Sequence, residues 1–371
     1  MVVPVAARSF AAVAGGALVI VAWTSVLGTL FVPRRKGNWL TRWTDRIVNW
    51  AFVAALGAVD DYQRRDRVLV AQGATSLIAQ FVAWLGISFI GFTLLLWPFL
   101  TEGITRALTI AGSSMTGVGL PEPTGTVPPV ILFAAAASGL VIVAPQIAYL
   151  PTLYGAYNRR ETEVLLLDER TGMPAWGPEL LARTHYALGS GVSTLDTLPA
   201  LYAQWERWAA DVGDTHTAYP PLVRFRSSGG LTSWVTSLLA VLDSAALFLA
   251  LAPNSAPTVP ARLCLREGFV CFSRVARAMG FDLPYESDPE SGISLTYQEF
   301  LNAVDRLRAV DFPIERDAAD AWPDFVGWRV NYEAASYAVA AAIDAVPAPW
   351  SGPRRTISGT IRPISPGWRA N

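Results

Sequence analysis

The sequence predicts an all-α membrane protein with three transmembrane helices, a re-entrant helix followed by a glycine-containing loop, and an all-helical cytoplasmic domain. Only 16% of the residues are charged, compared with ~25% in soluble domains. Three stretches, Ser9 to Pro33, Val68 to Thr101 and Pro123 to Asn158, contain no charge. Each exceeds the ~20 residues that a helix needs to cross a bilayer. After residue 160 charges return in a pattern typical of amphipathic helices.

Residues 1–33 are predicted to form an N-terminal transmembrane helix. Their apolar run is longer than the ~7–15 residues of a signal-peptide core. The basic cluster Arg34, Arg35 and Lys36 follows it directly, as expected after a segment that stays in the membrane. We therefore expect an anchor here and not a cleaved leader.

The connector, residues 34–67, carries an aromatic stripe. Trp39, Trp43, Ile47 and Trp50 recur at spacings of four, four and three, which places them on one face of a helix. Tryptophan favours the headgroup region, so we expect a helix over 38–58 that lies flat in the inner membrane interface. The alternative is a stripe that packs against the soluble domain.

The distribution of basic residues predicts the orientation in the plasma membrane. Residues 33–68 contain eight lysines and arginines, whereas residues 102–122 contain only Arg106. Short loops rich in these residues stay in the cytoplasm. We therefore expect the N-terminus outside, residues 34–67 inside, and everything after about residue 158 inside.

Residues 101–127, TEGITRALTIAGSSMTGVGLPEPTGTV, lie between the second and third stretches. Thr105 to Met115 can form a short helix, and the partial negative charge at its C-terminal end would favour a cation. Gly117 and Gly119 can adopt positive φ, which lets successive carbonyls face one axis. Such backbone is tolerated at membrane depth only when it is buried or lines a water-filled path. The pattern favours an ion pore within residues 68–158, and the alternative is an external Gly-Pro turn.

Two segments resemble a known family. The GSS sequence at 112–114 and the stretch YLPTLYGAYNRRE, Tyr149 to Glu161, are similar to those of bacterial potassium-channel family members of the two-span-plus-pore-loop kind. The resemblance covers about residues 35–170. It implies a homotetramer that conducts potassium or another monovalent cation passively, without a cofactor. By this resemblance 68–100 is the outer helix, 104–115 the pore helix, 126–155 the inner helix, and 38–58 the slide helix.

The family's filter pattern, TVGYGD, is matched incompletely, and two alignments stay open. Pairing both glycines gives Met115-Thr116-Gly117-Val118-Gly119, with methionine where the family has threonine. A shift by two residues begins at Gly117 and continues through Leu120, with Glu122 as the acid at the outer mouth. The candidate filter is therefore Met115, Thr116, Gly117, Val118, Gly119 and Leu120.

The predicted inner helix contains two candidate hinge residues. Pro145 frees a backbone carbonyl and can bend the helix, and Gly139 lies just before it. A gate hinge and a static kink are both consistent with this pair.

Residues 159–349 are predicted to form a helical cytoplasmic domain, followed by a flexible Pro/Arg-rich tail at 350–371. The stretch 231–252 is apolar enough for a fourth span, interrupted by Asp243. A span there would place four arginines outside, so a buried core helix is preferred. Pattern and punctuation predict helices near 161–169, 177–189, 195–211, 231–251, 259–279, 296–310 and 316–345.

The composition favours a membrane channel over other classes of protein. The net charge of −1 argues against a nucleic-acid partner. The histidines His185 and His216 are not spaced as a helix-borne metal pair, and no catalytic motif is recognisable, so no enzyme and no metal are expected. Cys264 and Cys271, seven apart, predict two buried thiols on one helix face. We expect a multimeric cation channel in contact with lipid. The alternative is a non-conducting membrane sensor or scaffold whose cytoplasmic domain binds a regulatory ligand or protein.

Overall fold

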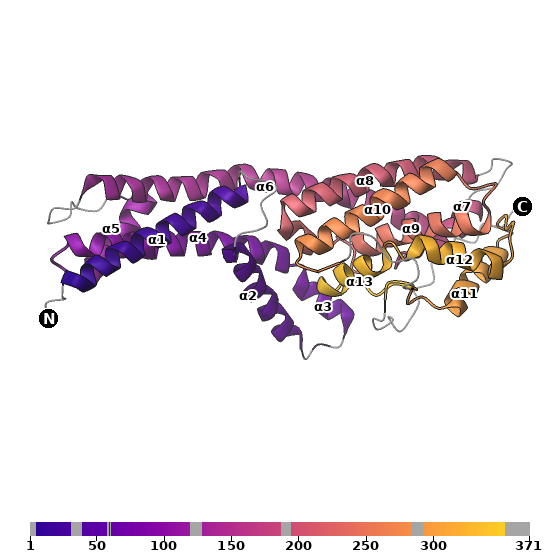
Figure 1. Ribbon diagram of the computed structural model, residues 1–371, viewed down its shortest axis with the longest axis horizontal. Coiled ribbons are helices and arrows are strands. Elements are labelled where there is room, and N and C mark those ends of the chain that lie inside the picture. The colour runs from indigo at the N-terminus through magenta and orange to yellow at the C-terminus, as the bar shows by residue number, and fades with distance from the viewer. Residues whose placement is uncertain are drawn as a thin grey trace, which may run out of the picture. The chain divides into compact units, whose positions relative to one another are not determined.

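The computed structural model describes residues 5–30, 39–57, 59, 61–118, 128–186, 194–283 and 292–352. In these ranges all regular secondary structure is helical. The chain divides into two compact units (Figure 1). Unit 1 comprises Met1–Ala58 and Ala71–Tyr154, and unit 2 comprises Val59–Val70 and Gly155–Asn371.

Unit 1 contains the long apolar helices near the N-terminus. Its elements are α1 (Val5–Leu30), α2 (Trp39–Leu56), α4 (Gln72–Leu96), the 3₁₀ turn η1 (Trp97–Phe99), α5 (Ile104–Thr116) and the first part of α6 (Pro129–Thr171). Helices α1, α4 and α6 each contain a stretch long and apolar enough to cross a membrane. The chain is therefore a multi-pass membrane protein.

Small residues bring α1 and α4 into close contact. A Cβ added to Gly15 would lie 2.5 Å from the carbonyl oxygen of Gly91, and one added to Gly91 would lie 2.9 Å from Cγ2 of Val19. Near the same interface Trp84 Nε1 donates a hydrogen bond of 3.0 Å to Ser25 Oγ. Close backbone approach and a buried polar bridge are the usual ways in which membrane helices associate.

Unit 2 is a helical bundle with one large apolar core. Its elements are α3 (Tyr62–Leu69), the end of α6, α7 (Gly177–Tyr186), η2 (Thr194–Thr197), α8 (Leu198–Ala218), η3 (Pro220–Arg224), α9 (Trp234–Leu251), α10 (Thr258–Ala278), α11 (Tyr297–Arg308), α12 (Ala318–Arg329) and α13 (Glu333–Ala342). The helices predicted from periodicity are present, with two differences. The segment predicted at 161–169 is the continuation of α6, and the segment at 316–345 forms two helices.

Helix α9 is the fourth helix long and apolar enough to cross a membrane. All of its residues are buried, and α7, α10, α12 and α13 of unit 2 pack around it. This burial agrees with the preferred prediction of a core helix. Because α9 is covered on every side by its own unit, it needs no lipid to shield its apolar surface.

The break between α12 and α13 corrects the prediction of one helix over 316–345. Asn331 Nδ2 donates hydrogen bonds to the carbonyl oxygens of Gly327 (2.9 Å) and Trp328 (3.2 Å). These oxygens lie in the last turn of α12, where intrahelical partners run out. The asparagine side chain thus terminates α12, and α13 begins two residues later at Glu333.

The division into units also differs from the boundaries expected at 34–67 and 159–349. Residues 59–70 belong to unit 2, although the sequence groups them with the aromatic connector. Arg65 pairs with Asp344 at 2.9 Å, which ties α3 to the end of the described chain. A second ion pair, between Arg226 and Asp66, also holds α3 within unit 2.

Candidate functional site

The short helix predicted at 104–115 is present as α5, and it packs inside unit 1. Its buried side chains are Ala107, Ile110 and Ala111, which join one cluster with residues of α4, η1 and α6. The cluster partners on those elements are Phe92, Leu96, Leu100 and Ala135. A helix of 13 residues is about half the length of its neighbour α4, so α5 ends while α4 and α6 continue beside it.

The C-terminus of α5 is capped by glycine. Gly117 has φ of 72° and its N–H donates to Ser113 O at 3.0 Å, the left-handed ending that glycine favours. Met115 and Thr116 lie in the last helical turn, and Thr116 Oγ1 donates to Gly112 O at 2.8 Å. Both residues belong to the first filter alignment and both are helical, and that alignment stays a prediction.

The rest of the candidate filter begins where α5 ends. Val118 is non-helical and exposed. Gly119, Leu120 and Glu122 lie outside the described residues, so the second alignment, which starts at Gly117, stays a prediction. That alignment is the one whose described residues, Gly117 and Val118, have left the helix.

Close contact fixes the end of α5 against α6. A Cβ added to Gly139 would lie only 2.0 Å from the carbonyl oxygen of Met115, so a side chain at 139 is excluded. On the other side, a Cβ added to Gly112 would lie 3.3 Å from Cε2 of Phe89. The C-terminal end of α5 is thus held between the backbone of α6 and an aromatic ring of α4.

The candidate hinge residues lie within a helix. Helix α6 is continuous through Gly139 and Pro145. The contact with Met115 supplies a packing reason for a glycine at 139, independent of bending. A gate at Gly139 and Pro145 stays a prediction.

In unit 2, the buried Arg160 joins α6 to the segment around η3. Its guanidinium contacts Glu161 Oε1 (2.8 Å from Nε), His216 Nε2 (2.9 Å from Nη1), Leu222 O (2.9 Å) and Phe225 O (2.7 Å). Because a guanidinium cannot accept a hydrogen bond, Nε2 of His216 must be the unprotonated nitrogen. The neighbouring cation and the buried position keep this imidazole neutral.

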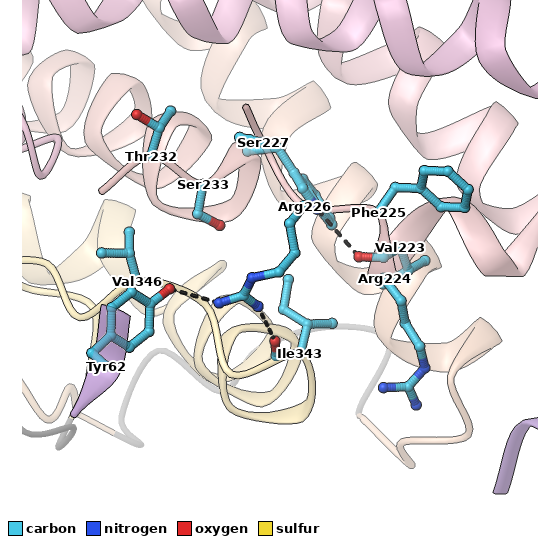
Figure 2. A pocket seen from close by; sticks show the side chains of 11 residues that line it. Tyr62, Val223, Arg224, Phe225, Arg226, Ser227, Thr232, Ser233, Ile343 and Val346 are labelled. Atoms are coloured by element: carbon cyan, nitrogen blue, oxygen red, sulfur yellow. Dashed lines mark hydrogen bonds between the residues drawn. The ribbon is translucent and has the colours of Figure 1, made fainter. Parts of the chain in front are cut away.

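Arg226 connects the same segment to α3 (Figure 2). Its guanidinium pairs with Asp66 and donates to Tyr62 Oη (2.7 Å), Ile343 O (2.8 Å) and Asp344 O (2.9 Å). The cavity around these groups has a volume of about 10 Å³, which is roughly room for one water molecule. It is a packed junction and not a ligand pocket.

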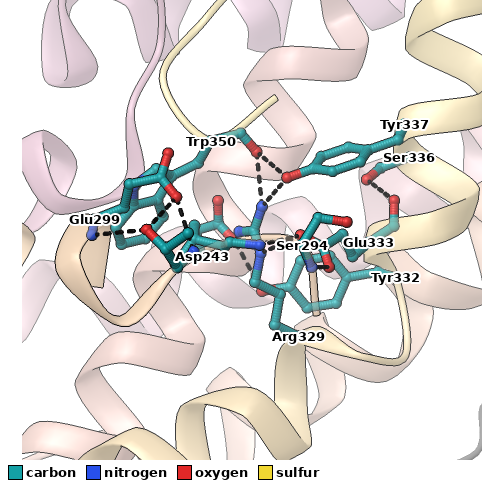
Figure 3. A network of polar contacts seen from close by, with 11 residues as sticks. Asp243, Ser294, Glu299, Arg329, Tyr332, Glu333, Ser336, Tyr337 and Trp350 are labelled. Atoms are coloured by element: carbon teal, nitrogen blue, oxygen red, sulfur yellow. Dashed lines mark hydrogen bonds and ion pairs between the residues drawn. The ribbon is translucent and has the colours of Figure 1, made fainter. Parts of the chain in front are cut away.

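A second buried arginine network surrounds Asp243 of α9 (Figure 3). Arg329 pairs with Asp243 and donates to Tyr337 Oη (2.9 Å) and Trp350 O (2.7 Å), while Tyr332 Oη donates to Asp243 at 2.8 Å. Burial disfavours the charged guanidinium, but the Asp243 carboxylate together with Tyr332, Tyr337 and Glu333 outweighs burial and raises the pKa of Arg329. The network fastens α9, α12, α13 and the last described residues together.

The aromatic stripe of α2 faces away from the other helices of unit 1. Trp39, Trp43, Ile47 and Trp50 are 54%, 52%, 58% and 70% exposed, whereas the opposite face of α2 is buried. The guanidinium carbon of Arg46, on the exposed side, lies 5.4 Å from the ring centroid of Trp43. Within unit 1 the stripe is therefore left uncovered, and both the interfacial position and packing against the soluble domain stay predictions.

Sequence reasoning did not single out Arg160, Arg226 or Arg329. In the sequence Arg160 is only one of two basic residues directly after the third uncharged stretch, and nothing local marks an arginine that will be buried. For Arg329 a signal existed: Asp243 inside an apolar helix requires a buried partner. Both cysteines are buried as predicted, and burial raises the pKa of each thiol. Among the described residues there is no group of three or more potential metal ligands.

No protein-family model, curated protein or solved structure matches this chain.

Proposed function

We propose that this protein is a multimeric channel for monovalent cations, with α5 and the segment after it as the re-entrant pore segment. The observation that carries the proposal is the contact between Met115 O and Gly139. Gly139 lies about ten residues into α6, or ~15 Å along its axis. This depth is about half of the ~30 Å hydrocarbon core of a bilayer. A helix that enters between two spans and stops at mid-depth is typical of an ion pore.

The electrostatics of the α5 end support a cation as the permeating ion. The last carbonyls of a helix carry partial negative charge, and those of α5 end at mid-depth beside α6. Val118, directly after the Gly117 cap, is non-helical. In hydrocarbon such backbone requires protein or water around it, and a water-filled axis between several copies supplies both. The resemblance to potassium channels makes the number of copies four and potassium the expected ion.

With three spans, α1, α4 and α6, the two ends of the chain lie on opposite sides of the membrane. In the plasma membrane, the positive-inside rule predicts that the N-terminus lies outside the cell and unit 2 in the cytoplasm. The membership of α3 in unit 2 supports this arrangement, because the α1–α4 connector and the C-terminal bundle must then share one side.

Flux through the purified protein in liposomes tests the proposal, with potassium and sodium gradients compared. Gly117→Ala forces an L-residue into a φ of 72° at the α5 C-terminus and is expected to abolish flux. Gly103→Ala is the matched control, since Gly103 has φ of 87° at the other end of the same helix. It is expected to conserve flux.

The result separates the two function classes. Loss of flux in Gly117→Ala alone, with assembly intact, supports the pore segment, and the ion ratio reports its selectivity. Equal loss in both variants means that the fold of α5 and not its pore end was disturbed. Absence of flux in the wild type over a range of voltage and pH favours the non-conducting sensor or scaffold.

A further inference from the structure

Helices α2 and α4 of unit 1 meet through a line of buried polar side chains. On α4 the line consists of Gln72, Ser76 and Gln80, which recur every four residues and are 3%, 5% and 9% exposed. Gln72 Nε2 donates to Asn49 Oδ1 at 3.1 Å, and Ser76 Oγ donates to Asp45 Oδ1 at 3.4 Å. Asn49 and Asp45 are also four residues apart, so the two helices run antiparallel with matching spacing along one face of each.

The third residue of the α4 line has no such partner. Gln80 Nε2 is buried and makes no hydrogen bond to any of the described residues. Continuing the pairing by four residues places Thr41 of α2 beside it, and the Thr41 hydroxyl lies 3.4 Å from that of Thr29 on α1. A buried amide without an acceptor is costly. The Asp45 carboxylate, the strongest kind of acceptor, is bound only one helical turn away along α4, at Ser76.

The packed face of α2 has the same four-residue period. Its buried residues are Leu40, Thr44, Val48 and Leu56. When α2 moves by four residues toward its own N-terminus, ~6 Å along its axis, Thr44 takes the place of Leu40 and Val48 takes the place of Thr44. The face that packs against the neighbouring helices therefore stays largely the same. One-turn shifts of one element past another occur in switching proteins because such packing has discrete arrangements.

We propose that α2 has two registers on α4: the one described and a second in which α2 lies one helical turn toward its own N-terminus. In the second register Asp45 accepts from Gln80, and Asn49 accepts from Ser76. Gln72 loses its partner there, but it is the first residue of α4. The unpaired amide thus moves from the interior of the interface to its end, where water can satisfy it.

The second register lengthens the path from α2 to α3. Residues 57–61 connect these two helices, and the boundary between unit 1 and unit 2 falls within them. A pull on this connector opposes the second register, and slack in it permits the shift. The packing of unit 1 thereby responds to the connector, whether or not the protein conducts ions.

Distances between paired spin labels test the proposal in the full chain in liposomes. Ile47→Cys on α2 and Ile90→Cys on α4 replace exposed side chains, and both native thiols are buried. The pairing of Asn49 with Gln72 places these two labels about sixteen residues of α4 apart, or ~24 Å along its axis. The second register shortens this separation to ~18 Å. We expect both distances in the wild type.

Two single substitutions shift the equilibrium in opposite directions. Gln72→Met removes a hydrogen bond that only the described register makes, so the ratio of short to long distances is expected to rise about fivefold. Gln80→Met removes the amide that only the second register satisfies, and the ratio is expected to fall by about the same factor. Ile20→Cys with Ile78→Cys, exposed on α1 and α4, gives a control distance that the shift of α2 does not change.

Opposite changes in the two variants, with the control distance constant, establish the two registers. Equal ratios in the wild type and both variants overturn the proposal and assign the Gln80 amide to a bound water molecule. Ratios that change in the same direction overturn it as well, because they do not follow the hydrogen bonds removed. Where one variant also alters the control distance, its α1–α4 packing is disturbed, and the ratio in the other variant decides.

Discussion

Gly139 shows how one hydrogen in place of a side chain positions a whole helix. Its Cα lies against the carbonyl oxygen of Met115, and a Cβ would overlap that oxygen at 2.0 Å. Neither partner can move easily, since both atoms belong to helix backbones. The sequence left a gate hinge and a static kink open at this glycine, and the structure adds a steric role. Close approach to a residue 24 positions away leaves no local signature.

Gly139→Ala is expected to separate α5 from α6 and to lower the thermal stability of the protein in detergent. A shift of backbone by even part of an ångström in a packed core typically costs 1–3 kcal/mol. Gly86→Ala is the control, because a Cβ there meets nothing within 4 Å and alanine is the better helix former. Equal melting temperatures for Gly139→Ala and Gly86→Ala, measured by scanning fluorimetry, would contradict the contact.

His216 is the other residue whose surroundings decide its chemistry. Burial first, and then the charge of Arg160, hold its pKa well below the ordinary value of 6.5. The imidazole is neutral in the folded state, whereas an unfolded chain protonates it below about pH 6.5. The unfolded state then binds more protons, so this residue removes stability as the pH falls below that value.

The expected pH dependence can be isolated with His216→Gln, since glutamine can still accept from Arg160 but does not titrate. Between about pH 7 and pH 5 the wild type should lose stability relative to the variant, by at most ~1.4 kcal/mol per pH unit. Melting temperatures of both proteins across this range provide the measurement. Parallel curves would show that the buried imidazole does not control the response.

At the scale of elements, α2 is amphipathic in an unusual sense, because its exposed face is the aromatic one. The tryptophans and Ile47 lie outward, while Asn49 on the inner side accepts a hydrogen bond of 3.1 Å from Gln72 Nε2 of α4. Exposed tryptophans together with arginines are typical of helices at the headgroup level. Continuity with the spans on both sides favours the same position, because α2 lies between α1 and α4.

A fluorophore on α2 is expected to report this interface. An NBD group on Trp50→Cys should emit at shorter wavelength in liposomes than the same group on Arg64→Cys, whose native side chain is 76% exposed on α3. The native thiols are buried and their raised pKa suppresses labelling, so each variant carries one reactive cysteine. Identical, water-like emission at the two positions would contradict a membrane-bound α2.

Most helices could be predicted from local pattern, and the exceptions have identifiable physical causes. Periodicity and Pro or Gly punctuation predict α9 and α10 closely, whereas α8 begins three residues and ends seven residues later than predicted. The break after Arg329 has no such punctuation, since it depends on Asn331 and on the pairing with Asp243 of another helix. Gly117 did carry a usable signal: a glycine directly after a helical pattern indicates its end, and this rule places Met115 and Thr116 inside α5.

At the scale of the whole molecule, the number of spans determines which segments of the chain lie on the same side of the membrane. α9 is enclosed by unit 2, so we expect α1, α4 and α6 to be the helices that cross the bilayer. The sequence offered both three and four spans, and only charge counting separated them. Burial of every α9 residue is a tertiary property, and composition alone could not supply it.

Three introduced cysteines would test this topology with a membrane-impermeant maleimide on intact cells. Thr101→Cys, exposed between α4 and α5, is expected to react. Arg64→Cys and Val259→Cys, the latter replacing a 68% exposed side chain on α10, should react only after permeabilisation. Labelling of Val259→Cys in intact cells would mean that α9 crosses the membrane after all.

Backbone carbonyls around η3 accept hydrogen bonds from Arg160 of α6, and Arg226 of the same segment pairs with Asp66 of α3. Tyr157 of α6 also donates to Arg226 O at 3.1 Å, so the two attachments share one stretch of backbone. α3 ends at Leu69 and α4 begins at Gln72, with only a short turn between them. The segment that leads into α4 and the segment that leads out of the apolar part of α6 are therefore both attached to the same stretch of backbone around η3. Separating these two segments of the chain would break the buried contacts that Arg160 and Arg226 make.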